Sequence, residues 1–390
     1  MKAIILCAGK STRTYPLTIN TPKPLLKILN KTILEHNLEQ LTELVDEIII
    51  IVGYLKEQII SKIGNKYKNI KIKYIEQKKQ LGTGHAVLLC ENLKGKFIVM
   101  CGDDLYSKKD IKKLLNHDNA ALAKKVQNPS EFGIFLTKNN KMTNIIEKPK
   151  NNIGNLANTG CYILNDNIFK LLKNTKKSKR GEIEIIDVFK KIKDFKIIEV
   201  TDFWIPIAYP WNYLEANVEF LKKIKKVIKG KIEKNNTIKG DIFLGKGSII
   251  KSNSYIEGPV YIGENCTIGP NAYIRKDTII MDNCNIRSEV YDSVIMNSTT
   301  AKHTSYIGHS VICENVNIGA GTITSDYRHD KKEHITIINN KKIETKRKKL
   351  GAFIGQNVKT GIGTLIYPGR KIWPNLGTLP GEILIKDKIK

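Results

Sequence analysis

An aliphatic residue stands at every sixth position of the chain between residues 238 and 286. Nine consecutive positions keep this spacing, and a small or β-branched residue follows each of them after four positions. A six-residue step suits one flat face of a parallel β-helix, where a short strand plus a tight turn makes one side and three sides make a coil. The aliphatic side chains would point inward and the others would fill the narrow corners. The aliphatic positions are Ile238, Leu244, Ile250, Ile256, Ile262, Ile268, Ile274, Ile280 and Ile286, and the corner positions are Ile242, Ser248, Ser254, Val260, Cys266, Ala272, Thr278, Cys284 and Val290.

The repeat loses its register after Val290 and returns farther along the chain. The returning elements are Ile307–Gly308, Ile312, Ile318–Gly319, Ile354–Gly355 and Ile366. The pattern resembles the left-handed β-helix of hexapeptide-repeat acyltransferases and of some nucleotidyltransferases. We therefore expect the C-terminal part of the chain to form a left-handed parallel β-helix of hexapeptide repeats.

The N-terminal part, up to about residue 210, alternates strand patterns with helical ones. Buried strands are expected at Lys2–Cys7, Glu47–Val52, Ile70–Glu76 and Lys96–Cys101, and a helix at Ile33–Leu44. This alternation predicts an α/β domain with a Rossmann-like, mostly parallel sheet and helices on both faces. Ligands of such sheets bind beyond the carboxyl ends of the strands, so the segments that follow strands are the candidate site.

The helical pattern over Asn212–Lys229, which ends at Gly230, predicts a linker helix between the two parts. A chain of 390 residues is long enough for two or three domains with separate cores. We therefore expect two domains, at residues 1–229 and 230–390.

The composition narrows the function classes. The formal net charge is +27, but lysines are scattered along the whole chain and do not form one patch with aromatic residues, so we expect no specific nucleic-acid partner. No apolar run is long enough to span a bilayer, and Met1–Ala8 is too short for a signal peptide, so we expect a cytoplasmic protein without a membrane partner. The seven cysteines show no zinc spacing, which favours reduced, buried thiols.

A glycine-containing loop follows the first expected strand and carries two basic residues. It runs from Leu6 to Arg13, and the segment Pro22–Leu26 (PKPLL) follows. Small residues there would let backbone N–H groups approach a triphosphate, while Arg13 and Lys23 would neutralise it. The two segments resemble the signature of sugar-1-phosphate nucleotidylyltransferases. The resemblance implies that Arg13 and Lys23 are catalytic, and that Leu6, Ala8 and Gly9 bind the nucleotide. Ser11 replaces the second glycine of that signature, and its Cβ restricts the backbone conformations that the loop can adopt.

Two later segments extend the resemblance. Gln77, Gly82 and Thr83 match the segment with which the family reads the uracil or thymine base. Asp103, in the element Gly102–Asp103 after an expected strand, matches the carboxylate that binds Mg²⁺. A hard cation held by one or two carboxylates plus phosphates suits phosphoryl chemistry.

The sugar-binding loops of the family also have counterparts. The resemblance assigns the sugar phosphate or its hydroxyls to Gly133, Glu147, Lys148 and Asn158, and a weaker match covers Arg180–Asp187. Pro206 stands where relatives often have a second metal-binding aspartate. Either a neighbour such as Asp202 replaces that ligand, or the nucleotidylyl activity is weakened or lost.

The point where the hexapeptide register breaks carries a second motif. His303 and Tyr306 form the motif H-x-x-Y. The segment Asn315–Thr324, which follows, reads NVNIGAGTIT. This resembles the acetyltransferase half of bifunctional UDP-N-acetylglucosamine synthesis enzymes, especially archaeal-type ones. The resemblance implies that His303 is the general base, a role that suits an imidazole near neutral pH, and that Ala320 contacts acetyl-CoA. Tyr306 and Asn317 would hold the sugar.

Departures from that family pattern cluster on the sugar side of this second site. Asp326 stands where relatives have Asn, and Tyr291 stands where relatives have a phosphate-binding Lys. Arg275 matches a phosphate contact of the family. Arg287 is a candidate replacement for the missing Lys. We keep Arg275 and Asp326 as sugar-phosphate contacts. The excursion over residues 325–350, with its basic run KRKK, would either meet phosphates or be a solvated loop.

Together these resemblances imply a bifunctional enzyme. It would acetylate glucosamine-1-phosphate, or galactosamine-1-phosphate, with acetyl-CoA as co-substrate, and join the product to a nucleotidyl group from UTP or dTTP with Mg²⁺. We expect a homotrimer. Two alternatives remain open: a single-activity nucleotidylyltransferase with a structural β-helix, and a non-catalytic regulatory subunit of the same architecture.

Overall fold

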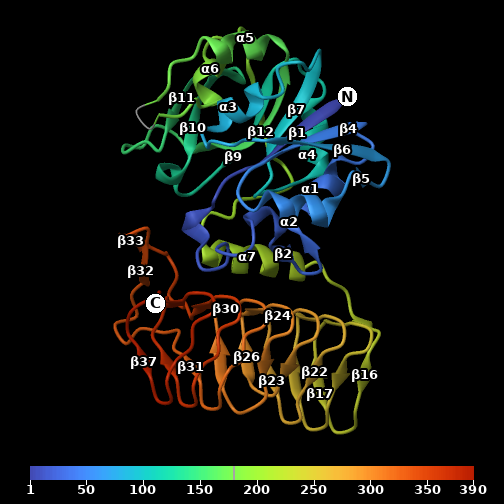
Figure 1. Ribbon diagram of the computed structural model, residues 1–390, viewed down its shortest axis with the longest axis vertical. Coiled ribbons are helices and arrows are strands. Elements are labelled where there is room, and N and C mark those ends of the chain that lie inside the picture. Colours follow the sequence, from blue (N-terminus) through green and yellow to red (C-terminus); the bar gives the residue numbers. More distant parts are fainter. Residues whose placement is uncertain (179–180) are drawn as a thin grey trace. The chain divides into compact units, whose positions relative to one another are not determined.

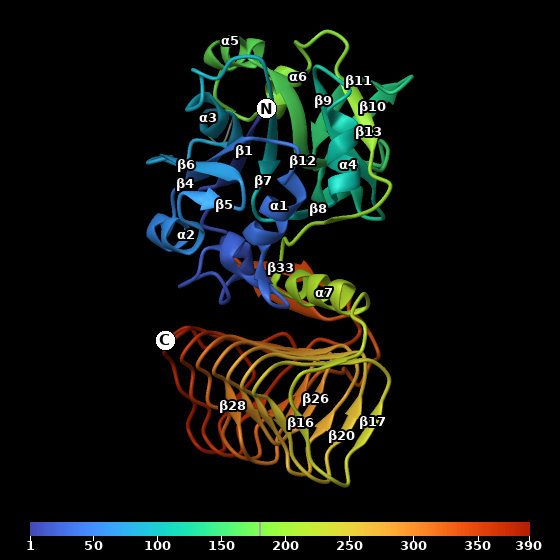
Figure 2. The same ribbon diagram turned by 90° about the vertical axis from the view of Figure 1, so that its right-hand side faces the viewer.

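The computed structural model describes residues 1–178 and 181–390, which divide into two compact units (Figures 1 and 2). Unit 1 consists of residues 1–10, 22–26 and 32–206, and unit 2 of residues 11–21, 27–31 and 207–390. The division at residues 229 and 230 stays a prediction for the domains. The helix α7 (Pro210–Leu221), which that division assigns to the first domain, contacts strands β24 and β30 of unit 2.

Unit 1 is built on one ten-stranded sheet with the order β10-β11-β13-β9-β12-β7-β1-β4-β6-β5. Its strands are β1 (Lys2–Cys7), β4 (Glu47–Val52), β5 (Lys66–Tyr67), β6 (Ile70–Glu76), β7 (Lys96–Cys101), β9 (Ala120–Lys125), β10 (Gly133–Lys138), β11 (Lys141–Glu147), β12 (Leu156–Asn165) and β13 (Lys196–Glu199). The four strands predicted from the sequence have the predicted bounds. β7, β1, β4 and β6 run parallel, whereas β12 is antiparallel to β7 and β9.

Helices cover both faces of this sheet because its central strands are apolar on both sides. The helices of unit 1 are α1 (Ile33–Leu41), α2 (Lys56–Ile63), α3 (Thr83–Leu88), α4 (Lys108–Leu114), α5 (Asn167–Lys173) and α6 (Ile186–Phe189). Apolar residues of α1, α2 and α4 share a core with Ile5 and Ile50, whereas those of α3, α5 and α6 share a second core with Ile4 and Ile51. The doubly covered, mostly parallel sheet of the prediction is confirmed.

Unit 2 is dominated by three parallel sheets whose strands follow one another in turn along the chain. The first contains β15 (Val227–Ile228), β18 (Ile242–Leu244), β21 (Val260–Ile262), β24 (Thr278–Ile280), β27 (Val294–Ile295), β30 (Val311–Ile312), β34 (Phe353–Ile354) and β36 (Lys371–Ile372). The second contains β16 (Lys231–Ile232), β19 (Ile249–Ile250), β22 (Thr267–Ile268), β25 (Asn285–Ile286) and β28 (Thr300–Ala301). The third, which we call the outer sheet, contains β17 (Thr237–Lys239), β20 (Tyr255–Glu257), β23 (Tyr273–Ile274), β26 (Glu289–Tyr291), β29 (Tyr306–Gly308), β31 (Ile323–Thr324), β35 (Leu365–Ile366) and β37 (Ile383–Leu384).

The six-residue period accounts for this coil. Register partners such as Ile250 and Ile268, or Ile256 and Ile274, are three steps of six residues apart, which is one coil. The periodic aliphatic residues from Leu244 to Ile286 are fully buried, and the corner residues that follow them are buried as well. The predicted inward orientation is therefore confirmed, and the three parallel sheets agree with a β-helix.

The break in register has a structural counterpart. The coil shortens between β24 and β27, where Ile280 pairs with Ile295, and between β26 and β29, where Val290 pairs with Ile307. The turn that carries His303 therefore lies beyond the regular repeats. The excursion after β31 forms an antiparallel hairpin of β32 (Ile335–Ile338) and β33 (Lys341–Glu344) before the chain rejoins the coil.

Two predicted helices are wrong in their C-terminal bounds. The helix expected over Ile33–Leu44 is α1, which ends at Leu41. The expected helix over residues 212–229 is α7, which ends at Leu221, and residues Val227–Ile228 form the strand β15. After Leu221 the sequence is mostly lysine, so a longer helix would have no apolar face, whereas Val227 and Ile228 pair in register with Phe243 and Leu244.

Two expectations drawn from the composition can be compared with the structure. Within residues 1–178 and 181–390, no helix is long and apolar enough to cross a bilayer. All seven cysteines are free thiols, and six of them are buried. Burial raises the pKa of the Cys7 thiol well above its usual value, as expected for an unreactive core cysteine.

Candidate active sites

The carboxyl edge of the sheet in unit 1 brings Lys23 and Asp103 together. Lys23 lies in a short 3-10 helix over Lys23–Leu25, and Asp103 follows β7. The Nζ atom of Lys23 donates to Oδ2 of Asp103 at 2.8 Å and lies 3.9 Å from Oδ1 of Asp104. The Lys23 side chain is only 6% exposed, whereas that of Asp103 is 36% exposed. A buried cation thus holds a carboxylate that remains open to a ligand.

Two carboxylates, those of Asp103 and Asp104, lie beside Lys23 and are suited to share a cation with a bound polyphosphate. Asp104 accepts a hydrogen bond from the indole Nε1 of Trp204 at 3.2 Å, and Asp202 accepts one from the Ser107 hydroxyl at 2.5 Å. Among residues 1–178 and 181–390, no three His, Cys, Asp or Glu side chains come together as ligands. Mg²⁺ accepts such a site, because it takes one or two carboxylates and completes its shell with phosphates and water. The residues present therefore fit this ion.

The predicted nucleotide loop follows β1 at the same edge. Its carbonyl groups are already bound: the carbonyl oxygen of Leu6 accepts from Gly102 N at 2.9 Å, and that of Ala8 accepts from Gln80 Nε2 at 2.8 Å. Gly9 has open space where a Cβ would project. These hydrogen bonds fix the loop, and Gly9 leaves room for a ligand to approach the backbone.

The predicted base-reading segment lies at the end of the neighbouring strand β6. The side-chain amide of Gln77, which is buried, donates to the carbonyl oxygen of Gly82 at 3.0 Å and faces Nδ1 of His85 at the same distance. Gly82 has a φ of 96°, and a Cβ there would lie 2.5 Å from the Ile183 carbonyl oxygen. Only glycine fits this turn. Thr83 Oγ1 accepts from Ile185 N at 3.2 Å.

The segment that holds this turn was a weak match in the sequence. Ile183 donates its N–H to Leu81 O and accepts from Gly84 N, both at 2.8 Å. The described part of Arg180–Asp187 thus supports the base-reading turn, whereas Arg180 itself lies outside the described residues.

The predicted sugar residues of unit 1 lie on three neighbouring strands. Gly133 on β10 pairs in register with Glu147 on β11, and the Gly133 Cα faces the Asn158 side chain on β12. Asn158 donates from Nδ2 to the Tyr162 hydroxyl at 2.9 Å. Glu147 and Lys148 are exposed, and the Lys148 N–H donates to Phe132 O at 2.9 Å. The structure therefore brings these four predicted residues to one place.

Arg13 and Ser11 belong to unit 2, so the position of Arg13 relative to Lys23 stays a prediction. The Arg13 guanidinium lies 5.7 Å from the centre of the Tyr209 ring. Ser11 has a φ of 51° and a ψ of 46°, a left-handed conformation that glycine adopts without strain. Its carbonyl oxygen accepts from Thr14 Oγ1 at 2.7 Å and Thr18 Oγ1 at 2.9 Å.

Replacing Ser11 with Gly is expected to stabilise the protein, because the Cβ of a left-handed residue costs about 1 kcal/mol. A gain of that size raises Tm by roughly 2–4 °C in a domain of this size. Thermal unfolding followed by circular dichroism measures it. Ser11→Ala is the control, since alanine keeps the Cβ and is expected to give no gain; equal Tm values for the Gly and Ala variants would refute the explanation.

In unit 2, two turns of adjacent coils carry the predicted acetyl-transfer residues. His303 lies in the turn before β29 with its side chain exposed, and its carbonyl oxygen accepts from the Ser288 hydroxyl at 2.9 Å. Gly321 N donates to Thr304 O at 2.8 Å. The turn of His303 therefore lies directly against the turn of Ala320, which is partly exposed.

Two of the predicted sugar contacts of unit 2, Tyr306 and Asp326, are bound to each other, whereas Arg275 and Asn317 have other partners. The Tyr306 hydroxyl donates to Asp326 Oδ2 at 2.7 Å, and Arg275 Nη1 lies 3.0 Å from Glu289 Oε1. The Arg275 guanidinium is 4.1 Å from the centre of the Tyr291 ring. Asn317 is exposed at a separate place, where its Oδ1 accepts from Thr300 Oγ1 at 2.9 Å.

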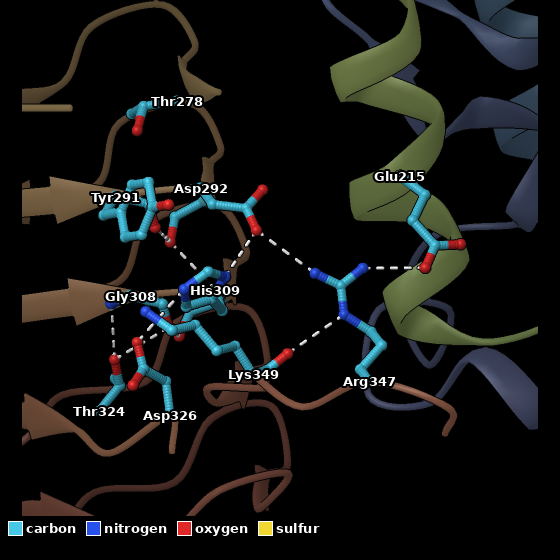
Figure 3. Close-up of polar contacts among 12 residues, drawn as sticks. Glu215, Thr278, Tyr291, Asp292, Gly308, His309, Thr324, Asp326, Arg347 and Lys349 are labelled. Atoms are coloured by element: carbon cyan, nitrogen blue, oxygen red, sulfur yellow. Dashed lines mark hydrogen bonds and ion pairs between the residues drawn. The ribbon is translucent and has the colours of Figure 1, made fainter. Parts of the chain in front are cut away.

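Three functional candidates, Asp292, His309 and Arg347, were not identified individually from the sequence. His309 lies between Asp292 and Asp326, and Arg347 contacts Asp292 from the excursion (Figure 3). The basic run was expected to meet phosphates or solvent, but Arg347 instead pairs with Glu215 Oε1 at 2.8 Å and Asp292 Oδ2 at 3.3 Å. The one available signal was the carboxylate of Asp326 in place of an amide, which a nearby histidine can balance.

Comparisons with known proteins agree with this division of features. Residues 2–222 match the family described as Nucleotidyl transferase, and residues 238–375 match the one described as GMPPB C-terminal domain. A Methanococcus maripaludis protein named Bifunctional protein GlmU is 49% identical over 384 residues, which covers 96% of this chain and 92% of that protein. A Sulfurisphaera tokodaii protein named Bifunctional sugar-1-phosphate nucleotidylyltransferase/acetyltransferase is 38% identical over 398 residues, which covers 99% of this chain and 98% of that protein.

Among solved structures, a Bacillus anthracis protein assigned as a glucose-1-phosphate thymidylyltransferase superposes with a TM-score of 0.53 and 28% identity. It covers 58% of this chain, while this chain covers 97% of it, which fits the nucleotidyltransferase fold of the N-terminal part. The chain therefore belongs to the nucleotidyl transferase family and, over nearly its full length, to the bifunctional GlmU proteins of archaea.

Proposed function

We propose that this chain is a bifunctional enzyme of UDP-N-acetylglucosamine synthesis. One site acetylates glucosamine-1-phosphate with acetyl-CoA, and the other transfers a uridylyl group from UTP to the acetylated product and releases pyrophosphate. The observation that carries this proposal is the match to relatives named for both activities over 96–99% of the chain. Residues 1–229 would supply the nucleotidylyl site, and residues 230–390, as a left-handed β-helix, the acetyl site.

The nucleotidylyl reaction uses the pair at the carboxyl edge of unit 1. A phosphate oxygen of the sugar phosphate attacks the α-phosphorus of UTP, and the bond to the β-phosphate bridging oxygen breaks. Lys23, held by Asp103 at 2.8 Å, and Arg13 neutralise the charge that spreads over the phosphates. Mg²⁺ bound by Asp103 would add to this neutralisation and orient the triphosphate. Gly9 admits the phosphates, and Gln77 with Gly82 and Thr83 faces the base.

The acetyl reaction uses the two adjacent turns of unit 2. The sugar amine attacks the thioester carbonyl of acetyl-CoA, His303 accepts the proton that the nitrogen loses, and the carbon–sulfur bond breaks to release CoA. The backbone N–H of Ala320 would stabilise the oxyanion. Tyr306, Asp326 and Asn317 hold the sugar, and Arg275 its phosphate.

A matrix of reactions tests the proposal. Pyrophosphate release is measured with UTP or dTTP against glucosamine-1-phosphate, galactosamine-1-phosphate and their N-acetyl forms, with and without acetyl-CoA. We expect release with UTP and N-acetylglucosamine-1-phosphate, and with glucosamine-1-phosphate only when acetyl-CoA is present. Release without acetyl transfer would indicate the single-activity enzyme, and neither activity would indicate a regulatory subunit. We infer a cytoplasmic location, because seven free thiols suit a reducing compartment.

The outer sheet supports a homotrimer. Ile323, Leu365 and Ile383 pair in register on β31, β35 and β37, and all three side chains are exposed, as is that of Tyr367 beside them. Such a contiguous apolar column typically marks an interface between subunits. We expect light scattering of the wild type to give three times the mass of the chain, with acetyl-CoA bound between subunits.

Leu365→Lys is expected to convert this trimer to a monomer, because it places a charge in the centre of the apolar column. Thr237→Lys is the matched control. Thr237 is exposed on β17, the first strand of the same sheet, so no strand precedes it in register. A trimer that survives Leu365→Lys, or a wild-type monomer with full acetyl transfer, would rule out this interface.

A further inference from the structure

The ring of His309 is buried between two carboxylates on the outer sheet of unit 2 (Figure 3). Its Nδ1 atom lies 2.6 Å from Asp292 Oδ2, and its Nε2 atom lies 3.4 Å from Asp326 Oδ2. The Nε2 atom is inaccessible to solvent and has no hydrogen bond of good geometry. His309 thus faces one strong acceptor and one that it engages only loosely.

The contact with Asp326 requires a proton. A neutral imidazole has one N–H, and the short distance to Asp292 assigns that proton to Nδ1. An unprotonated Nε2 would then face an ionised Asp326 with two acceptors 3.4 Å apart and no room for a water between them. One further proton, on Nε2 or on Asp326, turns this contact from repulsive into attractive. Histidine gains such a proton in the physiological pH range.

Charged and titratable side chains surround the ring on every element that packs against it. The groups that contact it directly are Asp292, Asp326 and Tyr291; the groups behind them are Tyr306, Arg347, Lys349, Arg275 and Asp277. The Tyr291 ring meets the His309 ring edge to face, with 4.8 Å between centres. Arg347 secures Asp292 from the opposite side at 3.3 Å, so Asp292 is the fixed end of the arrangement.

Asp326 is held less closely by His309 than Asp292 is, and it also binds the Tyr306 side chain. The Tyr306 hydroxyl donates to the same Oδ2 atom that faces His309. Burial and the bond to Asp326 raise the pKa of Tyr306, so the hydroxyl keeps its proton. Gly308 allows this approach, because a Cβ there would lie 2.5 Å from the Tyr306 oxygen and 2.7 Å from Asp326 Oδ2. The orientation of both sugar contacts therefore depends on one carboxylate oxygen.

We propose that His309 is a positioning residue for the amino-sugar site. Sharing a proton with Asp326 and anchored by Asp292, it holds Asp326 and Tyr306 in the orientation that binds the 2-amino group and ring hydroxyls of the sugar. This inference rests on the proposed acetyl transfer, and it adds that binding of the amino sugar depends on the contact between His309 and Asp326.

The contact between His309 and Asp326 acts on the amino-sugar side of the site and not on acetyl-CoA. Loss of this contact is therefore expected to raise KM for glucosamine-1-phosphate, whereas KM for acetyl-CoA stays level.

Two variants separate positioning from folding. His309 has a φ of 49°, and asparagine tolerates that conformation best, so His309→Asn keeps the turn and a polar atom near Asp292 but loses Asp326. We expect its KM for glucosamine-1-phosphate to rise roughly 10- to 100-fold, as for a lost hydrogen bond to a charged group, with kcat changed less. His309→Gln keeps a donor toward Asp326, so it should restore affinity. His329→Asn, an exposed histidine of the excursion, is the control.

A spectroscopic measurement decides the same question without the activity. The ring signals of ¹⁵N-histidine-labelled protein are compared by NMR between the wild type and Asp326→Asn, with assignment from His309→Asn. We expect the His309 ring signals to differ between the two proteins, and those of His117 to stay unchanged. Unchanged His309 signals, or an unchanged KM in His309→Asn, would overturn the positioning role. Absent acetyl transfer in the wild type would refute the proposed function instead, and the NMR comparison would still decide the contact.

Discussion

Replacing His303 with Ala is expected to lower kcat for acetyl transfer about 10²- to 10⁴-fold at neutral pH, the usual contribution of a positioned general base. KM for acetyl-CoA should change little, because the imidazole acts on the amine and not on the thioester. The side chain is exposed and only the backbone carbonyl of His303 is bound by Ser288, so the variant should fold normally. Steady-state kinetics of CoA release measures the effect.

A matched control separates the imidazole from its surroundings. Lys302→Ala, at the neighbouring exposed position, should keep the wild-type kcat for acetyl transfer. Uridylyl transfer should be untouched in both variants, because it uses Lys23 and Asp103. Acetylation at the wild-type rate in His303→Ala would make Asp326 the next candidate base.

Asp103→Asn is expected to reduce pyrophosphate release more than about 100-fold, while acetyl transfer persists. The carboxylate is the exposed partner of the buried Lys23 amine, and an amide can neither hold Mg²⁺ as strongly nor balance that charge. Lys23 keeps Asp104 Oδ1 at 3.9 Å as a second carboxylate, which limits the loss of stability. Pyrophosphate release with N-acetylglucosamine-1-phosphate and UTP, across a range of Mg²⁺ concentrations, is the measurement.

Asp202→Asn serves as the comparison for Asp103, because it tests whether Asp202 replaces the metal ligand that Pro206 cannot supply. Its carboxylate already accepts from Ser107 at 2.5 Å, so we expect a small effect on catalysis. A large loss confined to Asp202→Asn would move the metal to that residue. Unimpaired nucleotidyl transfer in Asp103→Asn would remove Asp103 from the site.

Local patterns predicted the elements whose burial repeats with a simple period. β1, β4 and β7 have the predicted bounds because each is a short apolar run that is mostly buried on both faces of the sheet, and β6 has them because its apolar residues Ile70 and Ile72 alternate with exposed lysines. The nine-step repeat predicted the coil for a similar reason, since each aliphatic residue meets its equivalent in the next coil. The end of α7 was predicted wrongly because pairing of Val227 and Ile228 with β18 is a long-range contact that no local period contains.

The sequence by itself determined that the chain combines an α/β sheet with a hexapeptide coil, and it located most candidate residues in contiguous motifs such as Gly82–Thr83 and His303–Tyr306. Contacts between residues far apart in the chain were decided only by the tertiary structure. These include the buried pair of Lys23 and Asp103, the two adjoining turns of His303 and Ala320, and the arrangement of Asp292, His309, Asp326 and Arg347. The physical reason is that a charged side chain becomes buried only where folding brings a partner to it, and a linear motif does not carry that information.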